Sequence, residues 1–176
     1  MKNKKIQLAL ASLTEEDLEA VRIIEKQCFG YTWPQDQYAR EIRNTKVACY
    51  LTAKHRGDLT GFVGAWMILD EVHITTIAVS PEFRGYRIGK FLLWSLFDKA
   101  VKENYRWSTL EVNIENPAAR HMYEQFGFEK IGERKDYYGQ GKNAIVMWTK
   151  IHNQRFKEIM DKNENDWKER ICLSWE

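Results

Sequence analysis

The chain has few of the residues that build disulfide frameworks or membrane spans. Its three cysteines, Cys28, Cys49 and Cys172, are an odd number without a close pair, which is typical of reduced thiols. Its apolar runs are too short to cross a bilayer, and residues 1–5 are polar, with no apolar signal segment behind them. We therefore expect a cytoplasmic protein with no membrane partner, in which Cys28 and Cys49 are small core residues.

Excess charge and metal-ligand spacing are also missing. Lysine and arginine number 27 against 25 acidic residues, a net charge of +2, and no run of cations alternates with aromatic residues. Both facts argue against direct nucleic-acid binding. The four histidines, His55, His73, His121 and His152, show no ligand spacing with one another or with the cysteines, so we expect no metal site.

What is present is the composition of a globular protein. Hydrophobic residues make up 44% of 176 residues, which suits one domain with a sizeable core. Gly61 and Gly64 fall inside an apolar run and indicate a bulge or a close backbone approach. The apolar spacing predicts strands at residues 6–13, 47–54, 59–69, 72–79, 107–113, 128–138 and 144–151, and helices at 18–28, 35–43, 88–104 and 117–126.

The C-terminal tail, residues 152–176, differs from this body, which we expect to span residues 1–151. Cations and anions balance from Lys150 onward, so the tail is not a basic arm. Apolar residues near its start predict a helix packed on the body. Trp167, Ile171, Leu173 and Trp175 suit either a self-docking patch or a dimer contact, and the sequence leaves both open, although we expect a monomer.

The stretch from Ile74 to Leu93 organises the chain. A β-branched strand stops at Pro81, and a loop bracketed by Gly85 and Gly89 leads into a helix. Such a loop points several backbone N–H groups one way, and the helix dipole adds to them, which favours an anion such as phosphate. Neither a Walker loop nor a dinucleotide fingerprint is present. The cations of this loop, Arg84, Arg87 and Lys90, favour a polyanionic ligand, or else form a solvated surface.

Two further features are open to a functional and a structural interpretation. The loop of Phe29, Tyr31, Trp33 and Pro34 is unusually aromatic: it forms a wall of a substrate groove, or Phe29 plugs the core while its neighbours cover it. Composition alone favours the second interpretation. In the strand at residues 107–113, Glu111 points away from its apolar neighbours, as either a solvent-facing residue or a site carboxylate.

Several motifs together resemble the GNAT acetyltransferase superfamily, most of all its RimI-type members. They are R-G-Y-R-I-G at the strand–helix junction, L-E-V-N-I-E-N-P-A-A, M-Y-E-Q-F-G-F, F-G-Y-T-W-P, I-A-V-S-P and R-K-D-Y-Y…N-A-I-V-M, within residues 6–151. The resemblance implies an α+β fold of α/β/α layers, with a mixed, mostly antiparallel seven-stranded sheet. It also implies acetyl transfer from acetyl-CoA to the α-amino group of a protein N-terminus, typically that of a ribosomal protein. A small-molecule or lysine acetyltransferase, or a non-catalytic acyl-CoA-binding module, are the alternatives.

The resemblance also implies roles for individual residues. Glu111 is implied as the general base and Tyr123 as the acid that protonates the leaving thiolate. Asn116, which also suits a helix N-cap, is implied near the thiol end of the donor. The implied donor-binding residues are Ile77, Ala78, Val79, Arg84, Gly85, Tyr86, Arg87, Ile88, Gly89, Lys90 and Asn116. The implied walls of the peptide groove are Phe29, Tyr31, Trp33, Pro34, Tyr137 and Tyr138.

One position departs from the family pattern. The pattern Q/R-x-x-G-x-G/A places a glycine where this chain has Arg87. If the backbone there has a positive φ, an arginine is strained by about 1 kcal/mol or more. Alternatively, the backbone tolerates arginine, and the site gains a charge beside the phosphates.

Overall fold

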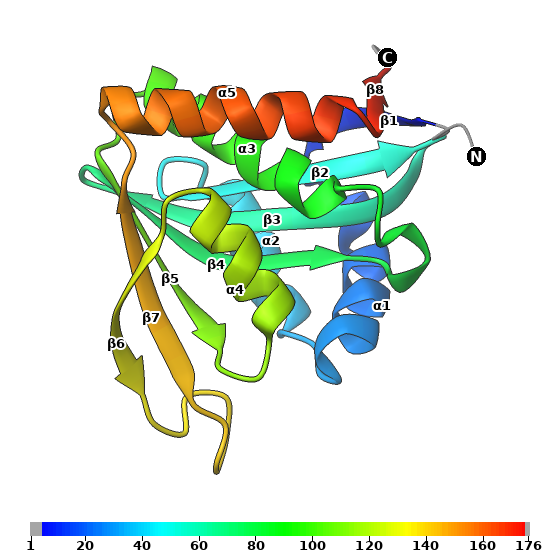
Figure 1. The fold of residues 1–176 in the computed structure, drawn as a ribbon. Helices are drawn as coiled ribbons and strands as arrows, with labels where there is room; N and C mark the ends of the chain where they lie inside the picture. The colour runs from blue at the N-terminus through cyan, green and yellow to red at the C-terminus, as the bar shows by residue number, and fades with distance from the viewer. Residues whose placement is uncertain (1–4, 175–176) are drawn as a thin grey trace.

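The computed structural model describes residues 5–174, which form one eight-stranded sheet covered by helices on both faces (Figure 1). The order across the sheet is β6-β7-β5-β4-β3-β2-β1-β8. Trp175 lies outside the described residues. The elements are β1 (Ile6–Ser12), η1 (Glu15–Asp17), α1 (Leu18–Phe29), α2 (Gln35–Arg43), β2 (Ala48–His55), β3 (Asp58–Ile68), β4 (Glu71–Val79), η2 (Pro81–Phe83), α3 (Ile88–Lys102), β5 (Trp107–Asn113), α4 (Pro117–Gln125), β6 (Glu129–Arg134), β7 (Ala144–Lys150), α5 (Gln154–Lys168) and β8 (Ile171–Leu173).

The sheet is mixed but mostly antiparallel, as expected. Strands β1 to β4 form an antiparallel meander, β4 pairs with β5 in parallel, and β7 pairs antiparallel with both β5 and β6. The expected count of seven strands is wrong by one, because β8 adds to the free edge of β1 in parallel. A strand of three residues is too short to show the alternation from which strands are predicted.

Helices α1 and α2 pack on one face of the sheet, and α3, α4 and α5 lie over the other (Figure 1). The larger core lies under α3, whose side chains Leu92, Leu93, Leu96 and Phe97 are fully buried. Burying a large apolar side chain of this kind contributes about 1.5–3 kcal/mol, so this helix anchors the layer.

Strand β3 bends where the sequence places its glycines. Its register with β4 shifts between Gly64 and Ala65. A Cβ atom on Gly64 would lie 2.2 Å from the ring of Tyr50, so only glycine fits there. The expected bulge is confirmed, and the close approach is made by an aromatic ring of β2.

The tail docks on its own chain through α5. Trp167 is 1% exposed and packs edge-on against Phe91, with 5.0 Å between ring centroids, and against Trp94, with 5.5 Å. The indole N–H of Trp94 donates to the carbonyl of Met160 at 3.2 Å. Ile171 is also buried, which excludes it and Trp167 from a dimer contact and supports the self-docking alternative.

Candidate active site

A gap in backbone pairing opens between β4 and β5. The two strands are paired only from Glu71 to Ile74 of β4, after which they diverge (Figure 1). Residues 75–79 therefore have no strand partner on the β5 side, while their other side pairs with β3. Thr76 Oγ1, in this stretch, is buried without a hydrogen-bond partner among residues 5–174. Ile77, Ala78 and Val79 lie on this open edge, which can accept an extended ligand as an added strand.

The loop after β4 leads into the N-terminus of α3, as predicted. Gly85 has a φ of 85°, a conformation that favours glycine. Arg87, at the N-cap of α3, has a φ of 64°, so the first of the two alternatives holds and the arginine is strained. Ile88 is buried beneath the first turn, Gly89 sits beside Met122, and Tyr86 is exposed. The first-turn N–H groups and the open β4 edge fit a phosphate-bearing ligand.

Two of the three cations of this loop, Arg87 and Lys90, are held by the C-terminal end of α5. Arg87 Nη1 lies 2.7 Å from Glu169 Oε2 and 3.1 Å from Asp166 Oδ1, and it donates to the Asp166 carbonyl. Lys90 Nζ lies 2.6 Å from Asp166 Oδ2. Arg84 instead contacts the sulfur of Cys28 at 3.6 Å. The tail therefore neutralises two of the cations that the sequence assigns to a polyanion.

Glu111 lies in β5 one residue beyond the pairing with β4, where the gap begins. Its carboxylate is only 5% exposed, which sets aside the solvent-facing alternative. Oε1 lies 3.2 Å from Arg134 Nη1, and Oε2 lies 3.3 Å from His73 Nε2. The Glu111 carboxylate is therefore buried between a guanidinium and an imidazole.

Tyr137 and Tyr138, in the connection between β6 and β7, lie beside Glu111. Tyr138 donates from its hydroxyl to the Glu111 carbonyl at 2.9 Å, and its ring is perpendicular to that of Tyr137. Burial, followed by the charges of Tyr137, Tyr123, Tyr31 and Glu111, raises the pKa of Tyr138 well above the usual range. The strand expected to reach residue 138 in fact ends at residue 134, because the following turn folds this tyrosine pair back toward β5.

Tyr123 reaches the site from α4. It is 5% exposed and packs edge-on against Phe128, with 5.7 Å between ring centroids. Burial raises the pKa of its hydroxyl far above that of a free phenol, so it keeps its proton at neutral pH. Asn116 caps this helix by accepting from the backbone N–H of Ala119 at 3.0 Å, with Pro117 next, as the sequence predicts.

The aromatic loop between α1 and α2 is exposed. Phe29, Tyr31 and Trp33 are 37%, 47% and 43% exposed, so the interpretation of Phe29 as a core plug is wrong. Gly30, with a φ of 78°, ends α1 and turns Phe29 outward, and Pro34 leads directly into α2.

A buried acid inside the domain holds this loop. Glu25 is 1% exposed, and its carboxylate accepts from the Tyr38 hydroxyl at 2.6 Å and from the backbone N–H of Trp33 at 3.1 Å. Burial raises the pKa of Glu25 although both hydrogen bonds oppose the shift.

The chain matches the acetyltransferase (GNAT) family over residues 18–128. A Bacillus subtilis protein named putative ribosomal protein bS18-alanine N-acetyltransferase is 34% identical over 149 residues, which cover 84% of this chain and 99% of that protein. This chain belongs to the GNAT acetyltransferase family. The family resemblance of its motifs is thereby confirmed. The alignment covers 99% of the Bacillus subtilis protein but only 84% of this chain, so part of this chain has no counterpart in that relative.

Solved GNAT structures show the same fold. The ribosomal-protein-S18-alanine N-acetyltransferase of Escherichia coli superposes with a TM-score of 0.75 at 27% identity, covering 83% of this chain and 95% of that one. NAA60 of Arabidopsis thaliana, solved in complex with acetyl-CoA, superposes with a TM-score of 0.71 at 19% identity, covering 82% and 98%. The expected GNAT fold is thus confirmed, with one strand more than expected.

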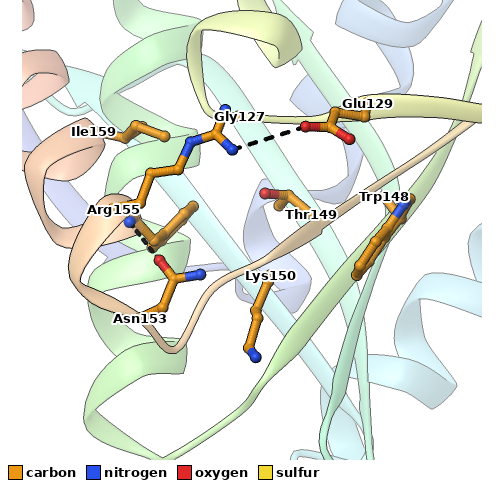
Figure 2. Close-up of a pocket in the computed structure, with 9 residues that line it drawn as sticks. Gly127, Glu129, Trp148, Thr149, Lys150, Asn153, Arg155 and Ile159 are labelled. Carbon is orange, nitrogen blue, oxygen red and sulfur yellow. Dashed lines mark hydrogen bonds and ion pairs between the residues drawn. The ribbon is translucent and has the colours of Figure 1, made fainter.

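A surface pocket of about 260 Å³ lies apart from this GNAT site (Figure 2). It is formed by β7 and the start of α5, and Arg155 crosses it toward Glu129 at 3.9 Å. Its strand residues Trp148 to Lys150 pair with the beginning of β5, whereas Glu111 pairs with Val146 farther along. It includes none of the residues predicted for the site.

Sequence reasoning missed four side chains of the site: His73, Arg134, Glu25 and Asp166. Only the pairing of strands brings His73 and Arg134 to Glu111, and only the docking of α5 brings Asp166 to Lys90. Of the four, only Glu25 could have been predicted from the sequence, because it lies on an otherwise apolar helix face, where a charged side chain needs a buried partner. Within residues 5–174, no cluster of three or more potential metal ligands occurs, and every helix falls short of the length and apolarity of a membrane span.

Proposed function

We propose that this protein transfers the acetyl group of acetyl-CoA to the α-amino group of a protein N-terminus, with a ribosomal protein as the acceptor. The observation that carries the proposal is the open edge of β4 beside the buried Glu111 carboxylate and the pair Tyr137 and Tyr138. The relatives named for alanine acetylation of ribosomal protein bS18 support the acceptor class. A ribosomal-protein acceptor would place the reaction in the cytoplasm. We propose residues 1–151 as the catalytic body, with the tail as an addition to it.

The donor fits the open edge and the loop. The backbone of residues 77–79 would pair with the amide-bearing arm of acetyl-CoA, and the N–H groups of residues 85–90 would hold its diphosphate. The N-terminus of α4, capped by Asn116, would stand near the sulfur. The residues assigned to the donor stay Ile77, Ala78, Val79, Arg84, Gly85, Tyr86, Arg87, Ile88, Gly89, Lys90 and Asn116.

Glu111 is proposed as the general base. A free α-amine has a pKa of about 8, so at neutral pH most of it is protonated and cannot attack a carbonyl. The Glu111 carboxylate, directly or through a water, takes this proton. The thioester carbonyl gains negative charge as the amine attacks, and a β4 backbone N–H at Ile77 or Val79 stabilises it.

Tyr123 is proposed as the acid. Its high pKa keeps the phenol protonated, so it can donate a hydrogen bond to the departing sulfur. It gives up the proton only as thiolate charge develops. Around this centre, the exposed loop of Phe29, Tyr31, Trp33 and Pro34 and the pair Tyr137 and Tyr138 would form the walls for an extended peptide.

The test is an acceptor screen. The protein is mixed with acetyl-CoA and peptides that begin with alanine, serine or methionine, and thiol release and peptide mass are followed. Acetylation of free N-termini, but not of the same peptides blocked at the N-terminus and carrying lysine, is expected. Turnover on spermidine or lysine side chains alone would overturn the proposal, and donor binding without any turnover would make the protein an acyl-CoA-binding module.

A further inference from the structure

His73 in β4 connects Glu111 to a second acid. Its Nε2 lies 3.3 Å from Glu111 Oε2, and its Nδ1 lies 2.8 Å from Thr109 Oγ1 in the neighbouring strand. The Thr109 hydroxyl in turn donates to Glu71 Oε1. Four side chains of two parallel strands therefore form one chain, from Glu71 through Thr109 and His73 to Glu111.

The two hydrogen bonds of Thr109 determine which ring nitrogen of His73 carries a hydrogen. A threonine hydroxyl has one hydrogen, and Glu71, as a carboxylate, can only accept. Because Thr109 gives its hydrogen to Glu71, it must accept from His73, so Nδ1 carries a hydrogen. In the neutral ring, Nε2 then has a lone pair, and it lies 3.3 Å from Oε2 of the Glu111 carboxylate. Two acceptors at 3.3 Å repel each other unless one proton lies between them.

We propose that His73 is a positioning residue that shares one proton with Glu111; this inference rests on the proposed function. An ammonium N–H bond of the acceptor breaks, and an O–H bond forms on Glu111. That O–H bond then breaks as an Nε2–H bond forms, which restores the carboxylate and leaves an imidazolium. The side chain of His73 is 27% exposed, so the proton leaves from it to water before the next turnover.

The surroundings of His73 suit this role. The Trp66 ring of β3 stacks on the imidazole, with 5.8 Å between ring centroids, and the Trp66 indole donates to Glu41 of α2 at 3.2 Å. Arg134 of β6 contacts the other oxygen of Glu111. The charged groups near the imidazole are thus Glu111 and, behind Thr109 and Trp66, Glu71 and Glu41. The cation Arg134 lies on the far side of Glu111, and the stacked Trp66 ring holds the plane of the imidazole.

The pH dependence of kcat tests the relay. With His73 in place, the competent state holds no proton between the pair, so kcat should fall as pH drops and the pair takes up a proton. In His73→Gln, no imidazole holds that proton, so the acidic limb of kcat should move to lower pH, and kcat should fall about tenfold or more. The matched control His152→Gln, on an exposed position, should change neither quantity. An unmoved acidic limb in His73→Gln would overturn the proposal.

A measurement without turnover separates this inference from the proposed function. The ¹⁵N shifts of the His73 ring in the free protein should show a hydrogen on Nδ1, and the Nε2 signal should change in Glu111→Gln at the same pH because the shared carboxylate is lost. A hydrogen on Nε2 alone, or an Nε2 signal unchanged by Glu111→Gln, would refute the sharing of a proton even if acetyl transfer is observed. If no acceptor is acetylated but both NMR results hold, the proposed function fails while the proton-sharing pair stands.

Discussion

The donor side and the acceptor side of the site are held in place in different ways. On the donor side, Arg87 and Lys90 are fixed by ion pairs to α5 whose side chains are about 19–67% exposed. On the acceptor side, Glu25 and the Glu111 carboxylate are almost fully buried. Exposed ion pairs are weak and screened by salt, whereas the loss of a partner from a buried hydrogen-bonded charge costs several times more. The donor loop is therefore adjustable, and the acceptor side is rigid.

The largest effect is expected from Glu111→Gln. The amide keeps the size of the side chain but cannot take a proton, so kcat should fall by about 10²–10⁴-fold with little change in the KM for acetyl-CoA. Steady-state kinetics with an alanine peptide measure both constants. Glu133→Gln, an exposed exchange of the same kind in β6, is the control. A decrease below threefold would remove Glu111 from the role of base.

Glu25 is the next test of the rigid side. Glu25→Ala leaves the Tyr38 hydroxyl and the Trp33 N–H without their partner, so the free energy of unfolding should fall by about 1–3 kcal/mol. Thermal or urea unfolding measures it, and a loss under 0.5 kcal/mol would show that the contact is dispensable.

Glu25→Gln gives the matching pH dependence. Because burial raises the folded-state pKa of Glu25 above its value in the unfolded chain, its stabilising contribution is complete at low pH and is lost as pH rises through the folded pKa. Glutamine imitates the protonated acid, so the variant should gain stability relative to the native chain as pH rises above about 4.5, the region where a free glutamate ionises. Parallel unfolding curves across pH check the sign, and the opposite trend would contradict the raised pKa.

Asp166→Asn tests the adjustable side. Removing this carboxylate leaves Lys90 without its ion pair and Arg87 with Glu169 as its remaining partner. The loop becomes more positive and should bind acetyl-CoA about two- to fivefold tighter. The free energy of unfolding should fall by at most about 1 kcal/mol. Isothermal titration at low and high salt measures the gain, which salt should diminish. Glu164→Gln, which removes another ion pair of α5, is the control. Weaker binding in Asp166→Asn would mean that α5 preorganises the loop instead.

Local sequence signals were enough for most of the fold and for the donor loop. The apolar run of β4, the stop at Pro81 and the glycines of residues 85–89 lie within one stretch, so strand, loop and helix follow from adjacent residues. The partners of Glu111 do not, because His73 and Arg134 are 38 and 23 positions away in the chain and meet it only through strand register. Strand β8 and the hold of α5 on Arg87 depend on where the tail docks: its apolar residues predict a docked helix but not its place on the body.

The smallest change in stability is expected from Arg87→Gly, which brings the position back to the family residue. Glycine relieves a positive φ that costs an arginine about 1–2 kcal/mol, but it adds about 0.5–1 kcal/mol of backbone entropy and loses two half-exposed ion pairs. These terms nearly cancel, so the free energy of unfolding should change by less than about 1 kcal/mol. Acetyl-CoA binding should weaken about two- to fivefold, because a cation beside the diphosphate is lost. Arg87→Lys, which keeps the charge and the strain, separates the two effects: equal affinities in both variants would show that Arg87 serves the tail and not the donor.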